Sequence, residues 1–399
     1  MRIAVAQHTS LWRNRDWLLL WSGQIVSSTG SRVSLLAFPL LTLAVTGSPA
    51  SAGVIVAMRG IPTALIALPA GALVDRWDRK RMMLICDLGR GLVLGSVAVA
   101  LAAQSLSLAH LAAAALLEGA MSTFFALGES ACIPRVVPPE QLGDAAAADQ
   151  TSAAAAEVIG STVGGALYNA GPGMPFIVDA LSYVASFGSL LLMRTPFQEQ
   201  RAPRTSPSLL ADMRDGLAWL WREPLVRFLA VLHGGVNLCG FGYTLILIVL
   251  AQAQGASAFE TGLVLSAGGA AAAVGSVLVS PLDRLLGRRG VLVASTWLLA
   301  LTWLAYAFAP TPFWLAAANA VACAAIPAYM ATQFSLRLSR TPDALQGRVG
   351  SVFRVLSFGL QPVSLVLTGA LLQQTGPQTT IVVLFAPQLI LALAATLWL

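Results

Sequence analysis

The sequence carries very little charge. Only 11% of its 399 residues are Asp, Glu, Lys or Arg, and lysine occurs once, at Lys80. A soluble domain usually has about 25% charged residues, because its surface faces water. This shortage excludes a soluble enzyme. Hydrophobic residues make up 57% of the chain and the mean hydropathy is +0.75, which indicates an integral membrane protein.

Residues that bind metals or build catalytic centres are also scarce. There are three histidines and four cysteines, and the cysteines are scattered at positions 86, 132, 239 and 323. Their spacing matches neither a metal site nor a disulfide framework. A glycine-rich loop ending in Lys-Ser or Lys-Thr is missing, so direct use of ATP is not expected. We therefore expect no metal, no cofactor, no nucleic-acid partner and no enzyme activity.

Long apolar runs, in contrast, are abundant. A membrane-spanning helix needs about 20 apolar residues, and twelve runs meet this length. In the first half they are 17–45, 51–74, 82–103, 108–130, 146–169 and 174–193. In the second half they are 225–252, 257–281, 290–309, 312–335, 349–372 and 378–398. These runs do not alternate between polar and apolar residues, which favours helices over the strands of a barrel.

The basic residues lie on one side of these spans. Twenty of the 24 Lys and Arg residues fall before the first span or in the connections that follow even-numbered spans. The other connections, near residues 48, 105, 171, 255, 310 and 375, have none. By the positive-inside rule, this pattern places both termini in the cytoplasm. A missed helix would move every later connection to the opposite side of the membrane. The consistent placement of the basic residues therefore supports the count of twelve.

The two halves of the chain resemble each other. Asp75-Arg76 ends the second span, and Asp283-Arg284 ends the eighth. Repeats of one topology are typical of transporters that rock two helix bundles about a central site. We therefore predict a six-helix bundle at 1–193, a cytoplasmic linker with an amphipathic helix at 194–224, and a second six-helix bundle at 225–399.

A charged motif follows the second span. It reads Gly-Ala-Leu-Val-Asp-Arg-Trp-Asp-Arg-Lys-Arg over residues 71–81, and it resembles the signature Gly-x-x-x-Asp-Arg-x-Gly-Arg-Arg of the major facilitator superfamily. Asp78 stands where the signature has glycine. This departure, together with Asp87-Leu-Gly-Arg90 in the third span, is similar to the branch that contains enterobactin exporters and macrolide efflux pumps. The resemblance covers the whole chain and implies an all-α fold of twelve transmembrane helices in two pseudo-symmetric bundles.

We interpret this motif as a gate. Asp75 can hold nearby basic residues and face the positive N-terminal end of the eleventh span. Contacts that exist in only one of two states bias the protein toward that state. The gating candidates are Gly71, Asp75, Arg76, Arg79, Lys80, Asp87, Arg90, Asp283 and Arg284. For the arginines, membrane topology alone is the alternative explanation.

Ionisable residues inside the spans are functional candidates, because a charge in lipid is costly. The resemblance implies that helices one, four, seven and ten line a central cavity. Glu118 in the fourth span is the first candidate for a proton-exchanging carboxylate, and Glu157 is the second. The alternative for Glu118 is a static ion pair with Arg32 or Arg59. Candidates for cavity and substrate contacts are Arg32, Phe124, Phe125, His233, Asn237, Phe241, Tyr243 and Tyr329. Packing is the alternative for His233 and the aromatic residues.

Together these features predict a secondary active exporter. We expect it to move a bulky, partly apolar small molecule, such as a drug, macrolide or siderophore, across the bacterial cytoplasmic membrane by alternating access. Protons would enter in exchange, and the protein would act as a monomer. The alternatives are a proton-coupled importer of a small metabolite, a lipid scramblase or flippase, and a non-transporting membrane scaffold. Only the family-like stretches favour export over import.

Overall fold

The computed structural model describes residues 10–74, 77–195, 197 and 209–398, and this part of the chain contains helices and no strands. The helices of the first half are α1 (Arg15–Thr46), α2 (Pro49–Val74), α3 (Arg79–Ala102), α4 (Leu108–Val136), α5 (Leu142–Ala170) and α6 (Met174–Leu192). Asn14, Asp78 and Ser107 precede three of them, and each side chain accepts a hydrogen bond from a backbone N–H of the first turn. Such caps satisfy donors that a helix leaves free. The all-α prediction is confirmed.

The second half is less regular. Its helices are α8 (Pro224–Gly240), α9 (Tyr243–Ala253), α10 (Ala258–Ala307), α11 (Pro312–Arg340), α12 (Gln346–Arg354) and α13 (Gln361–Trp398), with a π-helical turn at Val355–Gly359. Three short 3-10 helices occupy Leu11–Arg13, Pro139–Gln141 and Asp343–Leu345. The run 225–252, predicted as one span, is divided into α8 and α9. A Cβ atom on Gly242 would lie 2.0 Å from the Thr368 hydroxyl oxygen, so glycine permits the close approach at this division.

Two glycines interrupt the longest helical segments. Gly287 in α10 has φ 68° and ψ 161°, and Gly376 in α13 has φ 75° and ψ 170°. Glycine adopts positive φ at little cost because it has no Cβ atom. Gly287 lies between the predicted eighth and ninth spans, and Gly376 lies between the eleventh and twelfth. Each glycine therefore lets the chain change direction between two predicted spans.

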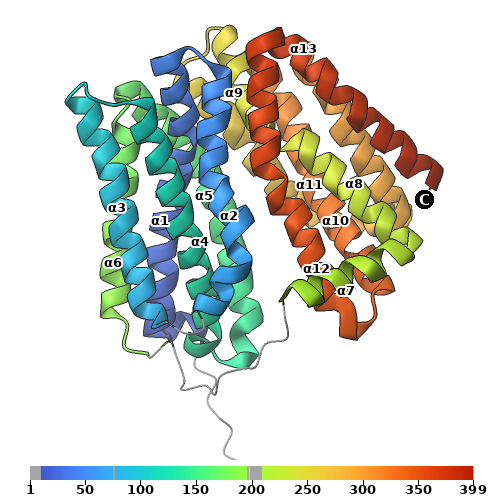
Figure 1. Ribbon diagram of the computed structural model, residues 1–399, viewed down its shortest axis with the longest axis horizontal. Helices are drawn as coiled ribbons and strands as arrows, with labels where there is room; N and C mark the ends of the chain where they lie inside the picture. The colour runs from blue at the N-terminus through green and yellow to red at the C-terminus, as the bar shows by residue number, and fades with distance from the viewer. Residues whose placement is uncertain (1–9, 75–76, 196, 198–208, 399) are drawn as a thin grey trace, which may run out of the picture.

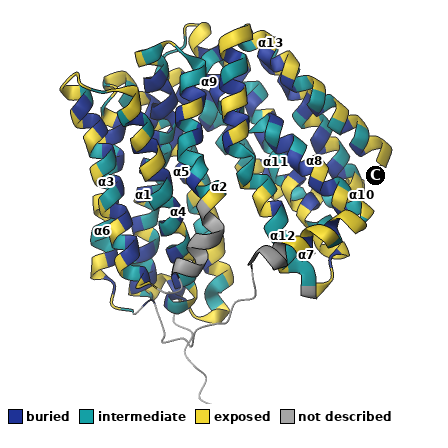
Figure 2. Cartoon of the chain, viewed as in Figure 1, coloured by how far each residue is buried: buried dark blue, intermediate teal, exposed yellow. Residues whose placement is uncertain are grey.

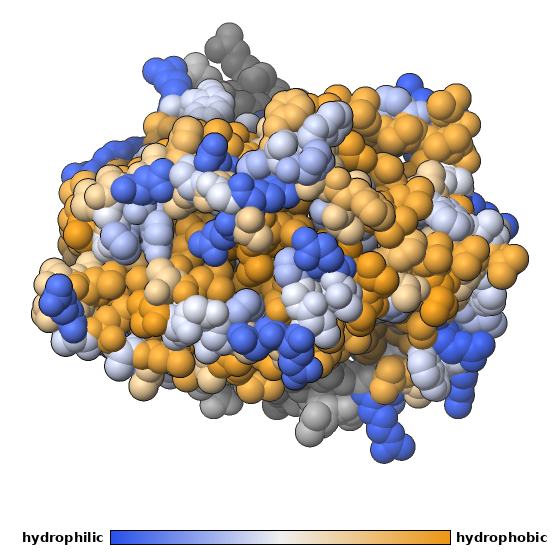
Figure 3. Space-filling model, turned by 90° about the horizontal axis from the view of Figure 1, so that it is seen from above, coloured by the Kyte–Doolittle hydropathy of each residue, from blue (hydrophilic) through white to orange (hydrophobic). Residues whose placement is uncertain are grey.

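The outer surface is rich in apolar side chains. Ile85, Val277 and Phe308 are 68%, 75% and 80% exposed. Figure 2 shows exposed residues along the outside of the helices, and Figure 3 shows that hydrophobic residues cover much of the molecule seen from above. Soluble monomers rarely expose apolar surface of this extent. Eight helices of the described residues are long and apolar enough to cross a membrane. The chain is a multi-pass membrane protein.

The helices form two bundles that stand side by side (Figure 1). The first bundle contains α1–α6 and the second contains α8–α13, each with its own buried core. The helix α7 (Leu209–Arg222) lies at the lower end in Figure 1, which we call the linker end. The predicted linker at 194–224 contains α7, and residues 196 and 198–208 of it lie outside the described residues. Gly216 of α7 packs against the backbone of Arg348 in α12, and Arg348 pairs with Asp215 at 3.3 Å.

The two bundles touch away from the linker end. A Cβ atom on Gly53 of α2 would lie 2.5 Å from the Leu365 carbonyl oxygen and 3.0 Å from the Cα of Gly369, both in α13. Leu40 of α1 packs in one buried cluster with Ile248 of α9. Small residues let helix backbones approach closely in membranes. These glycines therefore hold the bundles together at this end.

Candidate functional site

Glu118 of α4 is completely buried in the first bundle, where two arginines hold it. Arg59 of α2 binds both carboxylate oxygens, and its Nη2 donates to Oε1 at 3.1 Å. Arg90 of α3 donates to Oε1 from Nη2 at 3.1 Å and from Nε at 3.3 Å. Charge-assisted hydrogen bonds of this kind are among the strongest in proteins. Arg59 is thus a partner of Glu118, whereas Arg32 lies in a different site.

Hydroxyl groups extend this network to α1 and α6. The Tyr183 hydroxyl oxygen lies 3.2 Å from Glu118 Oε1, 3.4 Å from Asp179 Oδ2 and 2.9 Å from Ser31 Oγ. The guanidinium of Arg90 lies 4.0 Å from the centroid of the Tyr183 ring. We call this network the Glu118 cluster. It joins five helices of the first bundle and has the geometry of a structural core of buried charges.

A central cavity of about 270 Å³ lies between the bundles, lined by α1 and α5 on one side and by α9, α10 and α11 on the other. Arg32 and Glu157 meet there, with Arg32 Nη1 2.5 Å from Glu157 Oε2. Their side chains are 41% and 35% exposed, in contrast to Glu118. Tyr243 lines the same cavity. The structure therefore brings together three predicted residues from three helices and both bundles.

Two glycines make room for the Arg32–Glu157 pair. A Cβ atom on Gly160 would lie 2.4 Å from Arg32 Cβ, and one on Gly269 would lie 3.0 Å from Glu157 Cγ. Real Cβ atoms do not approach a side chain as closely as 2.4 Å. Gly160 therefore lets α1 and α5 come close enough for the ion pair to form.

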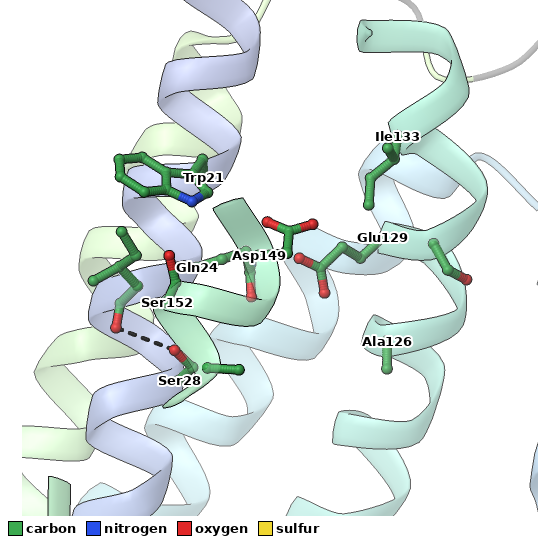
Figure 4. A pocket seen from close by; sticks show the side chains of 11 residues that line it. Trp21, Gln24, Ser28, Ala126, Glu129, Ile133, Asp149 and Ser152 are labelled. Carbon is green, nitrogen blue, oxygen red and sulfur yellow. Dashed lines mark hydrogen bonds between the residues drawn. The ribbon is translucent and has the colours of Figure 1, made fainter. Parts of the chain in front are cut away.

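An acidic pocket of about 260 Å³ lies within the first bundle, between α1, α4 and α5. Figure 4 shows Glu129 of α4 and Asp149 of α5 facing each other across it, with Trp21, Gln24 and Ser28 of α1 nearby. The indole N–H of Trp21 and the amide nitrogen of Gln24 are buried and have no hydrogen-bond partner among the described residues. The pocket thus combines two carboxylates with two free donors.

In the second bundle, His233 and Asn237 lie one turn apart on α8 and are buried. His233 Nε2 lies 3.0 Å from the amide nitrogen of Asn237 and 2.7 Å from Ser357 Oγ. The rings of His233 and Tyr329 are stacked, with centroids 6.2 Å apart. These three predicted residues form one cluster, and none of them is among the described residues that line the central cavity.

The predicted phenylalanines pack rather than line the central cavity. Phe124 stacks on Trp77 with ring centroids 5.9 Å apart, and Phe125 is buried in the core of the first bundle. Phe241 caps the C-terminal end of α8. None of the three is among the described residues that line the central cavity. Their apolar area stabilises the bundles through burial.

The predicted gating motif is described in part. Asp75 and Arg76 lie outside the described residues, and Gly71 lies in α2. Arg79 Nη1 donates to the carbonyl oxygens of Ala131 at 3.1 Å and Phe197 at 3.3 Å. Lys80 Nζ donates to the carbonyl oxygen of Met193 at 2.7 Å, just after α6. Basic groups near helix C-termini satisfy free carbonyls and favour the helix dipole. Arg79 and Lys80 thus connect the start of α3 to other segments of the first bundle.

The remaining motif residues have distinct local roles. Asp78, which departs from the signature glycine, caps α3 by accepting a hydrogen bond from the Arg81 backbone N–H. Asp87 lies 4.0 Å from Arg90, which belongs to the Glu118 cluster. In the second copy, Asp283 pairs with Arg288 at 3.8 Å, and Arg284 is exposed.

The sequence profile described as "Major Facilitator Superfamily" matches residues 20–241 and 228–399. The chain belongs to the major facilitator superfamily. This facilitator is 25% identical to the "Multidrug efflux pump Tap" of Mycolicibacterium fortuitum, over 95% of this chain and 94% of that protein. It is 27% identical to the "Enterobactin exporter EntS" of Salmonella typhi, over 84% of this chain and 80% of that protein. Macrolide efflux protein A of Streptococcus pyogenes is 26% identical over half of each chain. The predicted resemblance is confirmed.

Solved structures share the fold of this facilitator. The nucleoside transporter NupG has a TM-score of 0.78 at 14% identity, covering 96% of this chain and 98% of that chain. A bacterial homologue of the iron transporter ferroportin has a TM-score of 0.76 in its inward-facing state, at 17% identity over 98% and 99% of the two chains. The outward-facing state of that homologue has a TM-score of 0.60, at 18% identity over 96% and 99% of the chains.

Sequence reasoning missed several residues of this facilitator's polar sites. The prediction of Arg90 as a gating residue does not include its contact with Glu118 in the core. Ser31 and Ser357, one on each bundle, hold Tyr183 and His233 but look like ordinary small polar residues in the sequence. The spacing of Arg90 and Glu118 along the chain gives no signal of their contact, because they lie on different helices. These pairs become visible only when it is known which sides of the helices face each other.

Proposed function

We propose that this chain is a secondary active exporter of a bulky, partly apolar small molecule, driven by proton entry across the bacterial cytoplasmic membrane. The observation that carries the proposal is the half-exposed Arg32–Glu157 pair in the cavity between the bundles. Transporters built from two repeats place substrate and coupling ions at this interface. The names of the efflux relatives support drugs, macrolides or siderophores as the substrate class.

Helix lengths support twelve spans with both termini in the cytoplasm. The 50 residues of α10 would extend about 75 Å if straight, at 1.5 Å per residue, against a hydrocarbon core of about 30 Å. The break at Gly287 fits two spans, and Gly376 divides the last segment in the same way. The positive-inside pattern then assigns the linker end to the cytoplasm. In the membrane, the protein would work as a monomer.

The position of the bundle contacts supports an inward-facing state. The described contacts between the bundles gather away from the linker end, at Gly53 and Gly369. The higher similarity to the inward-facing ferroportin homologue than to its outward-facing state agrees with this assignment. Export would then begin with substrate entering from the linker end.

Of the two predicted coupling carboxylates, Glu157 is the one we assign to proton exchange. It is accessible and has a single basic partner, whereas Glu118 is sealed between two arginines. Asp149, Ala153 and Glu157 are each four residues apart on α5, so they share one face of the helix. Asp149 lines the acidic pocket and Glu157 lines the central cavity, so the two sites follow one another along α5. The two residues are about 12 Å apart along the helix axis, at 1.5 Å per residue. We propose this face as the route of the proton between Glu157 and the cytoplasm.

A compound screen tests the proposed function. Cells that lack their own exporters would express the chain and be challenged with macrolides, siderophores and other toxic compounds. We expect resistance to at least one compound and lower cellular accumulation of it than in cells with empty vector. The matched variant Glu157→Gln should lose this protection, and Glu140→Gln, at an exposed position, should keep it. Higher accumulation in expressing cells would instead indicate the importer alternative.

A further inference from the structure

A third cavity lies in the second bundle near the linker end. Its volume is about 550 Å³, within the range of small-molecule sites. It is lined by α8, α11, α12 and the π-helical turn. We call it the arginine cavity, because Arg337 of α11 and Arg354 of α12 both line it. None of the described residues that line it is acidic.

Both arginines keep their hydrogen-bond donors available. Neither has an ion-pair partner among the described residues. The guanidinium of Arg337 lies 4.3 Å from the ring centroid of Phe353 and 5.0 Å from that of Phe334. Stacking on an aromatic ring fixes a guanidinium group while leaving the N–H groups at its edge unused. Arg337 is therefore positioned to receive an acceptor from a ligand.

Two buried polar side chains in the same cavity also lack partners. His233 and Gln333 are each 3% exposed, and His233 Nδ1 and Gln333 Nε2 have no hydrogen-bond partner among the described residues. His233 Nε2 already lies within hydrogen-bond distance of Asn237 and Ser357, so Nδ1 is the ring nitrogen that is left without a partner. The free amide nitrogen of Gln333 is a donor, and so is the free ring nitrogen of His233 when it carries the proton. Buried donors are nearly always paired in proteins, and an acceptor-rich ligand would pair them here.

The π-helical turn at Val355–Gly359 is a third feature of this cavity. Such turns are rare and are frequent at functional sites. Ser357 in this turn lies 2.7 Å from His233 Nε2 and so fixes the orientation of the ring. The irregular backbone thus positions the buried imidazole ring of His233.

We propose that the arginine cavity binds an organic anion, with its carboxylate or phosphate group held by Arg337 and Arg354. Guanidinium groups match the oxygens of both anions. The cavity is larger than an inorganic ion, and Met330 and Phe334 supply apolar surface for the rest of the ligand. The acidic group comes either from a transported molecule, which rests on the proposed function, or from the headgroup of an anionic lipid. The exposed side chains of Phe334 and Leu338 form an apolar edge of the cavity, which either kind of ligand can contact.

A binding experiment on the purified full chain in neutral detergent tests this proposal without requiring transport. The probes are 2-naphthoate and its neutral analogue 2-naphthamide, titrated calorimetrically. We expect 2-naphthoate to bind at least tenfold more tightly than 2-naphthamide. Arg337→Gln should weaken 2-naphthoate binding at least tenfold and leave 2-naphthamide binding within twofold. Equal affinity of the two probes for the unmodified chain would overturn the proposal.

Two further variants keep the test decisive. Arg340→Gln removes an exposed arginine three residues further along α11 that does not line the cavity, and it should bind 2-naphthoate like the unmodified chain. If Arg340→Gln loses as much affinity as Arg337→Gln, general positive charge explains the binding and the proposal is wrong. Gln333→Met removes a buried donor with little change in volume, and it should weaken binding at least threefold even if Arg337→Gln does not fold.

The source of the anion is distinguished in lipid nanodiscs. The same titration is made in phosphatidylcholine alone and with added phosphatidylglycerol. A lipid headgroup in the cavity predicts that phosphatidylglycerol weakens 2-naphthoate binding at least tenfold, and that Arg337→Gln removes this competition. A site for a transported anion predicts no competition from phosphatidylglycerol. Both results require the same arginine chemistry and thus support the proposal.

Discussion

At the scale of single residues, two carboxylates that look alike in the sequence have opposite environments. Glu118 is sealed between Arg59 and Arg90, and Glu157 pairs with Arg32 at the edge of a cavity. From the sequence, a position inside a span could be predicted for both, because each lies within an apolar run. The partners of the two carboxylates could not be predicted, because the spacing of residues along the chain does not show which sides of neighbouring helices face each other.

Replacing Glu118 tests the structural role of its cluster. Glu118→Gln leaves two buried guanidinium groups without a counter-charge, and breaking a buried pair in this way costs about 3–5 kcal/mol. We expect a clearly lower midpoint of thermal unfolding in detergent and poorer expression, whereas Glu140→Gln should match the unmodified chain. Tyr183→Phe, which removes a hydroxyl of the same cluster, should destabilise by about 1–3 kcal/mol. Tyr168→Phe is its control, because the Tyr168 hydroxyl has no partner among the described residues. Unchanged stability of Glu118→Gln would show that the cluster is not structural.

At the scale of helices, the apolar runs predicted most of the elements, while the breaks followed packing. The predicted spans of the first half fall on α1–α6 with ends shifted by a few residues. The division at Gly242 escaped prediction because the apolar run continues on both sides of it. The π-helical turn at Val355–Gly359 has no sequence signal that we recognise, and it is held by the contact between Ser357 and His233.

The docking of α7 provides a test at this scale. A Cβ atom on Gly216 would lie 2.8 Å from the backbone of Arg348, which cannot move aside as a flexible side chain would. We expect Gly216→Ala to loosen α7 from α12 and to speed amide hydrogen exchange in residues 214–222 at least tenfold. Gly143→Ala, where nothing lies within 4 Å of the new methyl group, should leave exchange in this segment unchanged. Equal protection in both variants would mean that α7 is not held by this contact.

At the scale of the whole molecule, the internal repeat and the charge pattern predicted two bundles. The structure shows in addition where the two bundles meet. The contacts at Gly53 and Gly369 close the end away from α7. These two glycines look like ordinary small residues in apolar runs, so the sequence alone did not single them out. Alternating access requires that such contacts break and re-form between two states.

A methyl group at this contact should shift the balance between the states. Gly53→Ala would place Cβ 2.5 Å from a backbone oxygen of α13, so closure at this end is disfavoured. We expect faster labelling, from the outside, of a cysteine introduced at Leu40, in the buried cluster between the bundles. Gly95→Ala, with open space around its Cβ atom, is the control and should label slowly. Slow labelling in both would place the gate elsewhere.

The central claim is that proton exchange at Glu157 drives export through the cavity between the bundles. Its most direct test is transport in proteoliposomes, with a compound from the cellular screen and an imposed pH gradient. The account predicts that the unmodified chain concentrates the compound only while protons flow in the opposite direction. Glu157→Gln should still exchange the compound across the membrane but should not concentrate it. Accumulation without a pH gradient, or full accumulation by Glu157→Gln, would contradict the account.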